Sequence, residues 1–542
     1  MSSSLRLVRF APRELVAAVS IAAVSLLFVP PTATAGKIAA AKKAKPAKPT
    51  ATVPSVPSTT VVARKSLTVG TVSDLPGLDP ALSAGDIMGL GLPSAMYDTL
   101  TTATAGRPWA PSLAESLTET DDRLSWTLRV RPNVTFHDGT PFDAAAVKFN
   151  LDRYRGARVT GLASSAIRSV EVVDPMTVRL AVARPFAALP TLLSGTIGVM
   201  LSPKAIQQKG DSLNRQPSGA GTGPYMFQEW VPNDRAVVVR NPSYWGPVKP
   251  RLEQITFKPI PDEQSRLAAL LAGDIQSMIT SRRDLADRAA AAGFVRVSSL
   301  AQGSPGLLFN IAKPPFDDLR MRRAAALAID GDAIDELINS DSSKRGFGLW
   351  PTDNPWYSPI GNSPKYDRSA ARLLANDYIK TTGRDAAFTI LTVGGNQVLT
   401  DALRFEAKFL SDAGISVKIV EVADFSQLFG AIVTGQYEAA VSVFGLEKDP
   451  DSTAFPSLFS ASPANFGRYK NPEMDAALEA GRTAPDLASR RAAYARVQEI
   501  FRRDVPFLLA SPTSLVTISA KSVCGIDPAD GLSWRTAGIG NC

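Results

Sequence analysis

The chain has 542 residues, of which 45% are hydrophobic and 20% are charged, and its formal net charge is +8 at pH 7. At about 150 residues per domain, this length predicts two to four globular domains with a large core. Ten of the 59 Lys and Arg residues but only one of the 51 Asp and Glu residues lie in residues 1–65, so the rest is close to neutral and nucleic acid is excluded as a partner.

The first 35 residues have the pattern of a signal peptide. Arg6, Arg9 and Arg13 precede an apolar run from Leu15 to Val29, and Ala33–Ala35 is a small-x-small cleavage site. The apolar run is short for a membrane span, so an uncleaved anchor is the alternative. The pattern predicts export from the cytoplasm.

Residues 36–65 are rich in Ala, Lys, Pro and Thr and have no apolar periodicity. This composition predicts a disordered, extended spacer. Its lysines either touch an anionic envelope surface or remain solvated without a specific contact.

The two cysteines are Cys524 and Cys542. Because no cysteine follows the apolar run, the chain is not expected to be a lipoprotein. In an exported protein the pair predicts one disulfide that closes a loop of about 18 residues. Two free thiols are the alternative.

Strands and helices alternate after the spacer, which predicts an α/β protein with mainly parallel or mixed sheets. In the first half we expect, in chain order, a strand Leu67–Thr71, an alternating strand at Trp126–Val130, a helix capped by Asp143, a hairpin Val170–Val182, a hairpin of Tyr225–Trp230 with Ala236–Arg240, and a βαβ unit of Ile255–Pro259, Glu263–Ala272 and Ile275–Met278.

The second half has the clearer alternation. Asp317 is the expected N-cap of an alanine-rich helix. We then expect strands Phe388–Val393, Ile415–Val422 and Ala439–Phe444, with helices Gln397–Ala413 and Phe425–Thr434 between them. Because ligands tend to bind beyond the carboxyl ends of such strands, this pattern singles out Gly394, Gly395, Asn396 and the segment that begins at Phe444.

Three blocks carry a resemblance to a known family. They are "FHDGTPFDAAAVKFNLDRY" (Phe136–Tyr154), "GTGPYMFQEWVPNDRAVVVRNPSYWG" (Gly221–Gly246) and "FNIAKPPFDDLRMRRAAALAIDGDAI" (Phe309–Ile334). In this order and spacing they resemble the signatures of the family 5 solute-binding proteins of ABC importers. The chain departs at Ala146, where relatives usually carry an acidic residue that completes a capping box.

The resemblance implies a two-lobed fold of the periplasmic-binding-protein type (type II, cluster C) with an extra domain inserted in the first lobe. Carried onto this sequence, lobe I comprises 66–98, 216–303 and 508–542, the inserted domain comprises 99–215, and lobe II comprises 304–507. The lobes of similar proteins close over a ligand and deliver it to a membrane permease.

The segment Tyr437–Ser460 resembles the part of peptide-binding relatives that presents an aspartate to the ligand's ammonium group. Here Phe444 replaces a tryptophan, Glu447 stands nearest the binding aspartate, and Lys448 follows it. Asp449 keeps an Asp-Pro pair and is alternatively a turn cap. The resemblance thus implies ligand binding through Phe444, Glu447 and Asp449, although Lys448 competes for Glu447.

Two further regions are implied as ligand-facing. Trp350 and Trp356 lie where relatives have a long loop of lobe II, and each either stacks on ligand or packs in the core. Asp86, Ile87 and Met88 lie where relatives place a cleft-facing loop of lobe I.

Catalytic patterns are weak. His137 is the only histidine and lies inside a family signature, which favours a structural role. The sequence has no zinc-binding cluster, no Cys-His pair and no "GxSxG" elbow. We therefore expect no enzyme activity, no catalytic or metal-binding residues and no cofactor.

The leading functional hypothesis is a monomeric extracytoplasmic receptor that feeds an ABC permease. The expected ligand is a peptide, while nickel chelates, opines and oligosaccharides stay open because the family fold accommodates them. The protein is expected in the periplasm, in the cell envelope or secreted. The alternatives are a secreted hydrolase on a similar two-lobed frame and a sensor subunit that presents ligand to a receptor kinase.

Overall fold

The computed structural model describes residues 65–83, 91–103, 109–157, 160, 163–280, 282–338, 348–350, 352, 354–359, 365–394, 397–423, 425–445, 449–510, 513–526 and 534–540. The signal peptide and nearly all of the spacer predicted from the sequence lie outside these residues. Within them, no helix is both long and apolar enough to cross a membrane.

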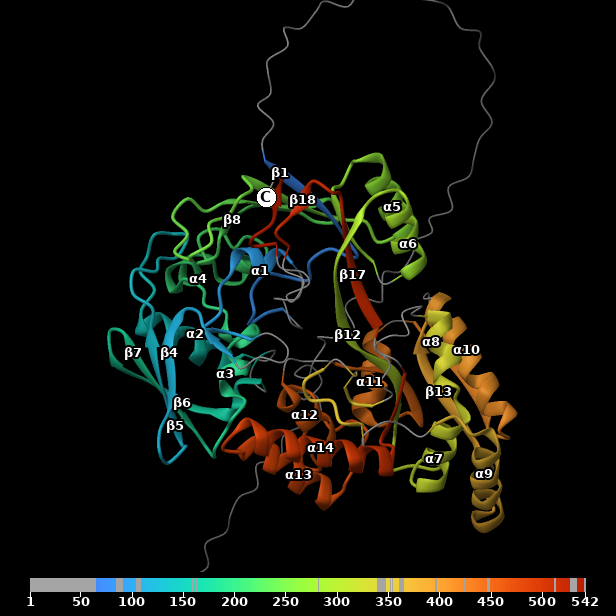
Figure 1. Ribbon diagram of the computed structural model, residues 1–542. Helices are drawn as coiled ribbons and strands as arrows, with labels where there is room; N and C mark the ends of the chain where they lie inside the picture. Colours follow the sequence, from blue (N-terminus) through green and yellow to red (C-terminus); the bar gives the residue numbers. More distant parts are fainter. Residues whose placement is uncertain are drawn as a thin grey trace, which may run out of the picture.

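One eleven-stranded mixed sheet runs through the molecule (Figure 1) in the order β14-β13-β15-β12-β17-β11-β1-β10-β9-β8, with β16 paired to β12. The first group of strands is β1 Ser66–Thr71, β8 Tyr225–Val231, β9 Arg235–Arg240, β10 Gln254–Pro259, β11 Ser277–Thr280 and β17 Thr513–Ser519. The second group is β13 Ala387–Val393, β14 Ser416–Val422, β15 Ala439–Phe444 and β16 Phe507–Leu509, and β12 Val295–Phe309 joins the two groups.

Strand β12 changes partners partway along its length. Its first part pairs with β17 as far as Gly303, which lies opposite Thr513. From Ser304, which lies opposite Phe444, it pairs with β15 and β16. We call the strands before this change, with their helices, the first region, and those after it the second region. The change falls at residue 304, where lobe II was expected to begin, whereas the expected return at residue 508 falls inside β16.

The first region contains the predicted βαβ unit. Strands β10 and β11 both run parallel to β1, which lies between them. The connecting helix α5, Glu263–Ala272, begins at the side-chain cap Asp262 and ends at Gly273, whose φ of 84° is left-handed. The prediction is therefore confirmed, although the second strand begins later than expected. The remaining elements are α1 Leu92–Met96, α6 Arg283–Ala291, β18 Val523–Cys524 and β19 Gly538–Ile539.

The second region confirms the predicted alternation. Its helices are α7 Leu319–Ala328, α8 Gly331–Ile338, α9 Arg368–Thr382, α10 Gln397–Asp412, α11 Phe425–Thr434, α12 Ala454–Leu458, α13 Pro472–Thr483 and α14 Leu487–Asp504. The cap predicted for α7 is wrong by one residue. Asp318, not Asp317, accepts a hydrogen bond from the Arg320 backbone N–H, while Asp317 pairs with Arg384 on the surface.

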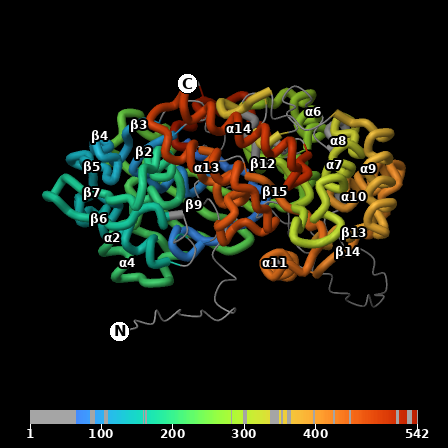
Figure 2. Tube along the Cα trace, turned by 90° about the horizontal axis from the view of Figure 1, so that it is seen from below, coloured from blue at the N-terminus to red at the C-terminus, as the bar shows by residue number. Residues whose placement is uncertain are grey.

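A separate four-stranded antiparallel sheet with the order β4-β5-β7-β6 lies within residues 99–215. Its strands are β4 Ala114–Glu119, β5 Ser125–Val130, β6 Ile167–Asp174 and β7 Thr177–Val182, and the other elements of this segment are β2 Thr101–Thr102, β3 Ala110–Pro111, α2 Ala144–Gly156, α3 Leu189–Leu192 and α4 Pro203–Lys209. The predicted hairpin and the alternating burial of β5 are confirmed. Figure 2 shows this sheet at one end of the molecule and α7–α10 at the other.

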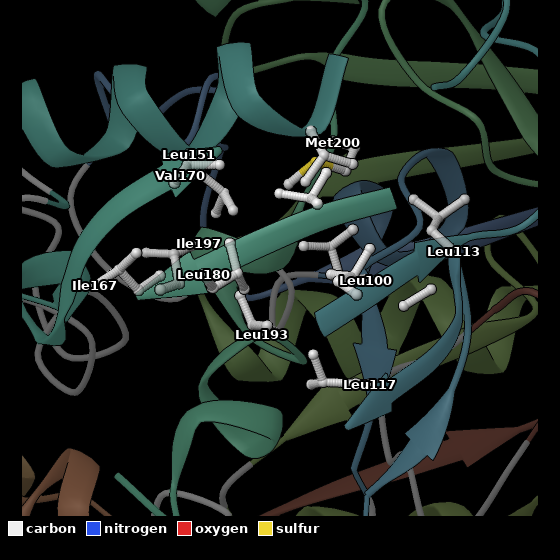
Figure 3. Packing of buried hydrophobic residues seen from close by; sticks show 14 of the residues in the cluster. Leu100, Leu113, Leu117, Leu151, Ile167, Val170, Leu180, Leu193, Ile197 and Met200 are labelled. Atoms are coloured by element: carbon white, nitrogen blue, oxygen red, sulfur yellow. The ribbon is translucent and has the colours of Figure 1, made fainter. Parts of the chain in front are cut away.

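Helix α2 covers the four-stranded sheet with one apolar face. Asp143 caps it by accepting a hydrogen bond from the Ala146 N–H at 2.8 Å, as predicted. Val147, Leu151 and Tyr154 are fully buried in a core whose members come almost entirely from residues 100–200. Figure 3 shows part of this core, including Leu151. Segment 99–215 therefore has a core of its own.

Candidate ligand-binding site

The carboxyl ends of β13 and β15 point to the same edge of the sheet, because β13 runs parallel to both β14 and β15. This edge is where α/β sheets commonly bind ligands. Of the residues predicted for the site, Gly394 follows β13 and Phe444 ends β15. Asp86, Met88, Gly395, Asn396 and Glu447 lie outside the described residues.

Gly394 is held by its backbone at this edge. Its N–H donates to the Val422 carbonyl at 3.1 Å, and a Cβ atom placed on it would lie 3.2 Å from Glu421 Oε2. One residue before β13 ends, Thr392 is fully buried, and its hydroxyl has no hydrogen-bond partner within the described part of the chain. A larger residue at position 394 would therefore displace the Glu421 side chain.

Phe444 packs beside a second hydroxyl without a partner. It lies opposite Ser304 in the sheet and meets Phe507 edge-on, with ring centroids 5.9 Å apart. Ser304 is fully buried. Among the residues that the structure describes, neither its hydroxyl nor that of Thr453 has a hydrogen-bond partner. Thr453 lies close to the end of β15. Gly445 directly follows this strand, and a Cβ atom placed on it would lie 3.5 Å from the Thr453 methyl group.

Trp350 is part of the core of the second region. It is fully buried and meets the Tyr494 ring edge-on at 6.1 Å. Trp356 also packs against Tyr494, at 5.6 Å. The sequence left core packing and ligand stacking open for both, and the structure places both in the core. The indole N–H of Trp350 nevertheless has no partner within the described residues.

Asp449 forms a buried ion pair with Arg490. It is 2% exposed, and its two carboxylate oxygens accept hydrogen bonds from the Arg490 guanidinium at 2.6 and 2.7 Å. It also accepts from the Asp451 N–H at 2.9 Å, as the cap of a short 3-10 helix, Pro450–Ser452. The expected turn cap is confirmed. The ligand-binding role expected for Asp449 is corrected, because Arg490 already occupies its carboxylate.

A second buried carboxylate, Asp451, completes this cluster. The Arg482 Nε donates to its two oxygens at 3.0 and 3.1 Å. Burial raises the pKa of Asp451 to about 6, although Arg482 opposes the shift. Burial lowers the pKa of Arg490, but the attraction of Asp449 raises it overall. Sequence reasoning missed both arginines because they lie more than 30 residues away, in or at the end of other helices, and nothing local marks them.

The second signature block surrounds one buried aspartate of the first region. Asp98 is 2% exposed and accepts hydrogen bonds from the Thr222 hydroxyl at 2.9 Å and the Trp245 indole N–H at 2.8 Å. Arg535 also pairs with it. A Cβ atom on Gly223 would lie 2.5 Å from the Met96 carbonyl. These parts of the block therefore support the fold, since Thr222 and Trp245 both use their polar atoms on Asp98.

His137 also has a structural place, as predicted. Its Nε2 lies 2.9 Å from the Gly223 carbonyl oxygen, and burial lowers its pKa. No group of three His, Cys, Asp or Glu side chains within the described residues is arranged to hold a metal ion. Cys524 is in the disulfide-bonded form. Its expected partner, Cys542, lies outside the described residues, so their pairing stays a prediction.

Comparisons with known proteins agree with this arrangement. The glutathione-binding protein GsiB of Salmonella paratyphi A is 27% identical over 496 residues, which cover 88% of this chain and 95% of the relative. DppA from Helicobacter pylori, an ABC transporter-associated periplasmic binding protein in complex with the peptide STSA, is 25% identical with a TM-score of 0.75 and covers 88% of this chain and 99% of its own.

NikA from Brucella suis, in complex with Fe(III)-EDTA, shares the fold at 23% identity and a TM-score of 0.77, with 88% of this chain and 99% of its own covered. The two-lobed fold that the resemblance implied is therefore confirmed. The family model of bacterial extracellular solute-binding proteins, family 5, matches residues 109–466. The chain belongs to the bacterial extracellular solute-binding proteins of family 5.

Proposed function

We propose that this protein captures peptides between its two lobes and delivers them to the permease of an ABC importer. As a family 5 member the chain is a substrate-binding protein of this transport class. The observation that carries the peptide assignment is the likeness to a glutathione-binding relative and to a peptide complex, each over 88% of this chain. The nickel-chelate and opine complexes among the similar structures are less than 25% identical and support the fold alone.

The sheet edge offers groups suited to a peptide backbone. The hydroxyls of Ser304, Thr392 and Thr453 and the indole N–H of Trp350 are buried without partners in the described part of the chain. Leaving such a group unpaired costs about 1–3 kcal/mol. A peptide carries carbonyl acceptors and N–H donors at regular intervals and would satisfy these groups. We therefore add Ser304, Thr392 and Thr453 to the proposed ligand contacts.

Of the residues inferred from the sequence, we keep Asp86, Met88, Gly394, Gly395, Asn396, Phe444 and Glu447 as proposed contacts. We keep Trp350 only through its unpartnered indole N–H, because its ring packs in the core. Asp449 becomes a positioning residue, because its pair with Arg490 fixes the chain directly after Glu447 and Lys448. Glu447 is the proposed partner of the peptide ammonium group. Unchanged affinity of Glu447→Ala for a confirmed peptide would remove Glu447 from the site.

Capture requires the lobes to move relative to each other. The chain crosses between the two regions within β12 and again between β16 and β17. A ligand stabilises the closed state only as far as it binds both lobes better there than in the open state. Bending at these two crossings would bring the β13–β15 edge toward the first region.

We further propose that the protein acts outside the cytoplasm as a monomer, after export by its signal peptide. Retention by an outer membrane, by wall association through the spacer or by an uncleaved anchor would each keep it near its permease. The relatives are solute-binding proteins rather than enzymes, and we propose no catalytic role. Ligand-dependent closure without turnover would support this view, whereas product formation would favour a hydrolase.

The deciding experiment is native mass spectrometry of residues 36–542 secreted from the protein's own host. Gentle unfolding would release whatever copurifies. We expect a heterogeneous set of peptide masses, because few contacts would read the side chains. A single non-peptide mass would overturn the peptide assignment and leave membership of the family intact.

A Ser304→Val variant sharpens the experiment, since valine fills a similar volume but lacks the hydroxyl. We expect it to retain less peptide than the wild type. Glu171→Gln, which changes an exposed residue of the four-stranded sheet, is the matched control and should retain as much peptide as the wild type. Equal retention by both variants would remove Ser304 from the site.

A further inference from the structure

Segment 99–215 touches the second region far from the strands that connect the two regions. In Figure 1 the end of β4 and β5 lies beside the end of α13. Arg123, in the turn between these strands, donates from its two terminal nitrogens to the Thr483 carbonyl at 2.8 Å and the Ala484 carbonyl at 2.9 Å. These carbonyls belong to the last turn and the C-cap of α13. A cation at this position is favourable, because carbonyls at a helix C-terminus lack partners within the helix and carry partial negative charge.

Two further contacts surround the one made by Arg123. The Ala187 N–H donates to the Arg482 carbonyl at 3.0 Å, and Arg184 pairs with Glu479 at 2.7 Å. Three consecutive carbonyls at the end of α13 therefore accept hydrogen bonds from segment 99–215. Thus α13 receives its C-terminal cap from a different part of the molecule.

Arg482 joins this contact to the buried cluster beside the candidate ligand site. Its guanidinium carbon lies 3.2 Å from the centroid of the Phe455 ring and 5.3 Å from that of Phe186, which belongs to segment 99–215. Its Nε donates to Asp451, two residues after Asp449. A displacement of Asp451 would therefore reach α13 and segment 99–215 through these side chains.

The contact spans parts that are anchored in different regions. Segment 99–215 is tied to the first region by Arg153, which pairs at 2.6 Å with the fully buried Asp79. Helix α13 packs in the core of the second region through Met474 and Leu478. Any change in the angle between the two regions therefore stretches or breaks the hydrogen bonds at the end of α13.

We propose that these contacts form a latch between segment 99–215 and the end of α13, and that this latch sets how often the two regions lie together before ligand arrives. On one side the latch consists of Arg123, Arg184 and the Ala187 N–H, and on the other of Glu479, Arg482, Thr483 and Ala484. Arg123 contributes most, because its two hydrogen bonds are charge-assisted and its side chain is held by Glu119 at 3.2 Å. Arg184 contributes less, since its pair with Glu479 is exposed to solvent.

The test uses residues 36–542 freed of ligand and compares variants that retain the fold. Arg123 has a φ of 58°, a left-handed conformation that glycine adopts without strain. Arg123→Gly thus removes the guanidinium and leaves the turn relaxed, and it is combined with Arg184→Ala. The matched control is Arg179→Ala, which removes an exposed arginine of the same segment that pairs with Glu171 inside its own sheet.

Two readouts report on the latch: hydrogen exchange of the Ala187 amide and the radius of gyration from X-ray scattering. We expect the double variant to exchange at Ala187 at least about tenfold faster than the control, to have a larger radius of gyration and to unfold cooperatively, with a melting temperature lower by only about 2–4 °C. Arg184→Ala alone should give a smaller increase, of about two- to fivefold. Exchange and radius equal to those of the control would overturn the latch. Because no ligand is present, that result would leave the proposed peptide ligand untouched.

Discussion

The buried pair of Asp449 and Arg490 is the residue-scale contact that most directly supports the candidate site. Asp449→Ala would leave the Arg490 guanidinium buried, at 6% exposure, without its charged partner. Removing one member of a buried ion pair typically costs about 3–5 kcal/mol. We expect a loss of this size in the free energy of unfolding of the second region, measured by urea denaturation followed through tryptophan fluorescence.

Two further variants show whether that loss comes from the unpaired charge. Glu171→Ala removes an exposed partner of Arg179 and should cost less than about 1 kcal/mol. Replacing both members of the buried pair, as Asp449→Leu with Arg490→Met, should recover part of the loss, because no buried charge then lacks a partner. A double variant as unstable as Asp449→Ala would point to packing instead.

Glu406, on α10, predicts how stability depends on pH. Its side chain is buried, one carboxylate oxygen has no partner within the described residues, and burial raises its pKa to about 7. The folded state therefore binds this proton more tightly than the unfolded state, whose pKa is about 4.3. The contribution of Glu406 to stability is therefore complete below the unfolded-state pKa. The free energy of unfolding then falls by about 3 kcal/mol as the pH rises from there toward 7.

Urea denaturation at several pH values between 4.5 and 7.5 tests this dependence. Glu406→Gln cannot ionise and should make it shallower, leaving the part that comes from Asp451, whose pKa burial also raises, whereas Glu171→Gln on the exposed sheet should not change it. An unchanged slope in Glu406→Gln would show that another group is responsible.

At the scale of elements, the helix start at Asp143 makes a prediction about capping. The first turn of α2 contains no acidic residue, so Asp143 alone supplies a negative charge and a side-chain acceptor there. Asp143→Ala should cost about 1 kcal/mol, and Asp143→Ser should restore most of it, because serine also caps well. Thermal unfolding of the two variants measures the difference. Equal stability of both would mean that the cap does not limit the stability of this helix.

Local pattern predicted the elements well and their ends less well. The alternation in β5 and the glycine stop at Gly273 were visible because both depend on a few neighbouring residues. Asp317 and Asp318 both have the chemistry of a cap, and only the folded path of the chain assigns the cap to Asp318. Residues that differ little in local preference are thus distinguished by their distant partners.

The candidate site was predicted in part for the same reason. The carboxyl ends of β13 and β15 follow from strand order, so Gly394 and Phe444 could be named from the sequence. The ion pair between Asp449 and Arg490 could not be predicted from the sequence, because 41 residues separate the two and many other arginines could have been the partner. Ser304 could not be recognised either, since a lone serine becomes notable only when it is buried without a partner.

At the scale of the whole molecule, the two regions share one continuous sheet but have separate hydrophobic cores. The eleven-stranded sheet passes from one region to the other through β12, yet the buried side chains fall into separate clusters on the two sides. Backbone pairing between the regions is confined to a few strands, which bend more easily than a packed core. This arrangement suits lobes that move as bodies about the shared strands.

Segment 99–215 should fold without the rest of the chain. Its main core uses only Ala81 and, in part, Trp245 from outside the segment, whereas Val199, Leu201, Ala205 and Leu213 pack in the core of the first region. Loss of the Asp79 partner leaves Arg153 free to be solvated. We expect a fragment of residues 99–215 to unfold cooperatively, with an enthalpy of about 80 kcal/mol near 60 °C on the usual scaling with length. Calorimetry and near-ultraviolet circular dichroism measure both properties.

Leu151→Ala tests whether the same core stabilises the fragment and the intact protein. Leu151 is fully buried against the four-stranded sheet, and its truncation should cost about 2–5 kcal/mol in either context. A fragment that melts gradually and lacks a near-ultraviolet signal would show that segment 99–215 needs the first region to fold. In that case segment 99–215 would be part of the first lobe rather than a domain inserted in it, and the latch would join two lobes directly.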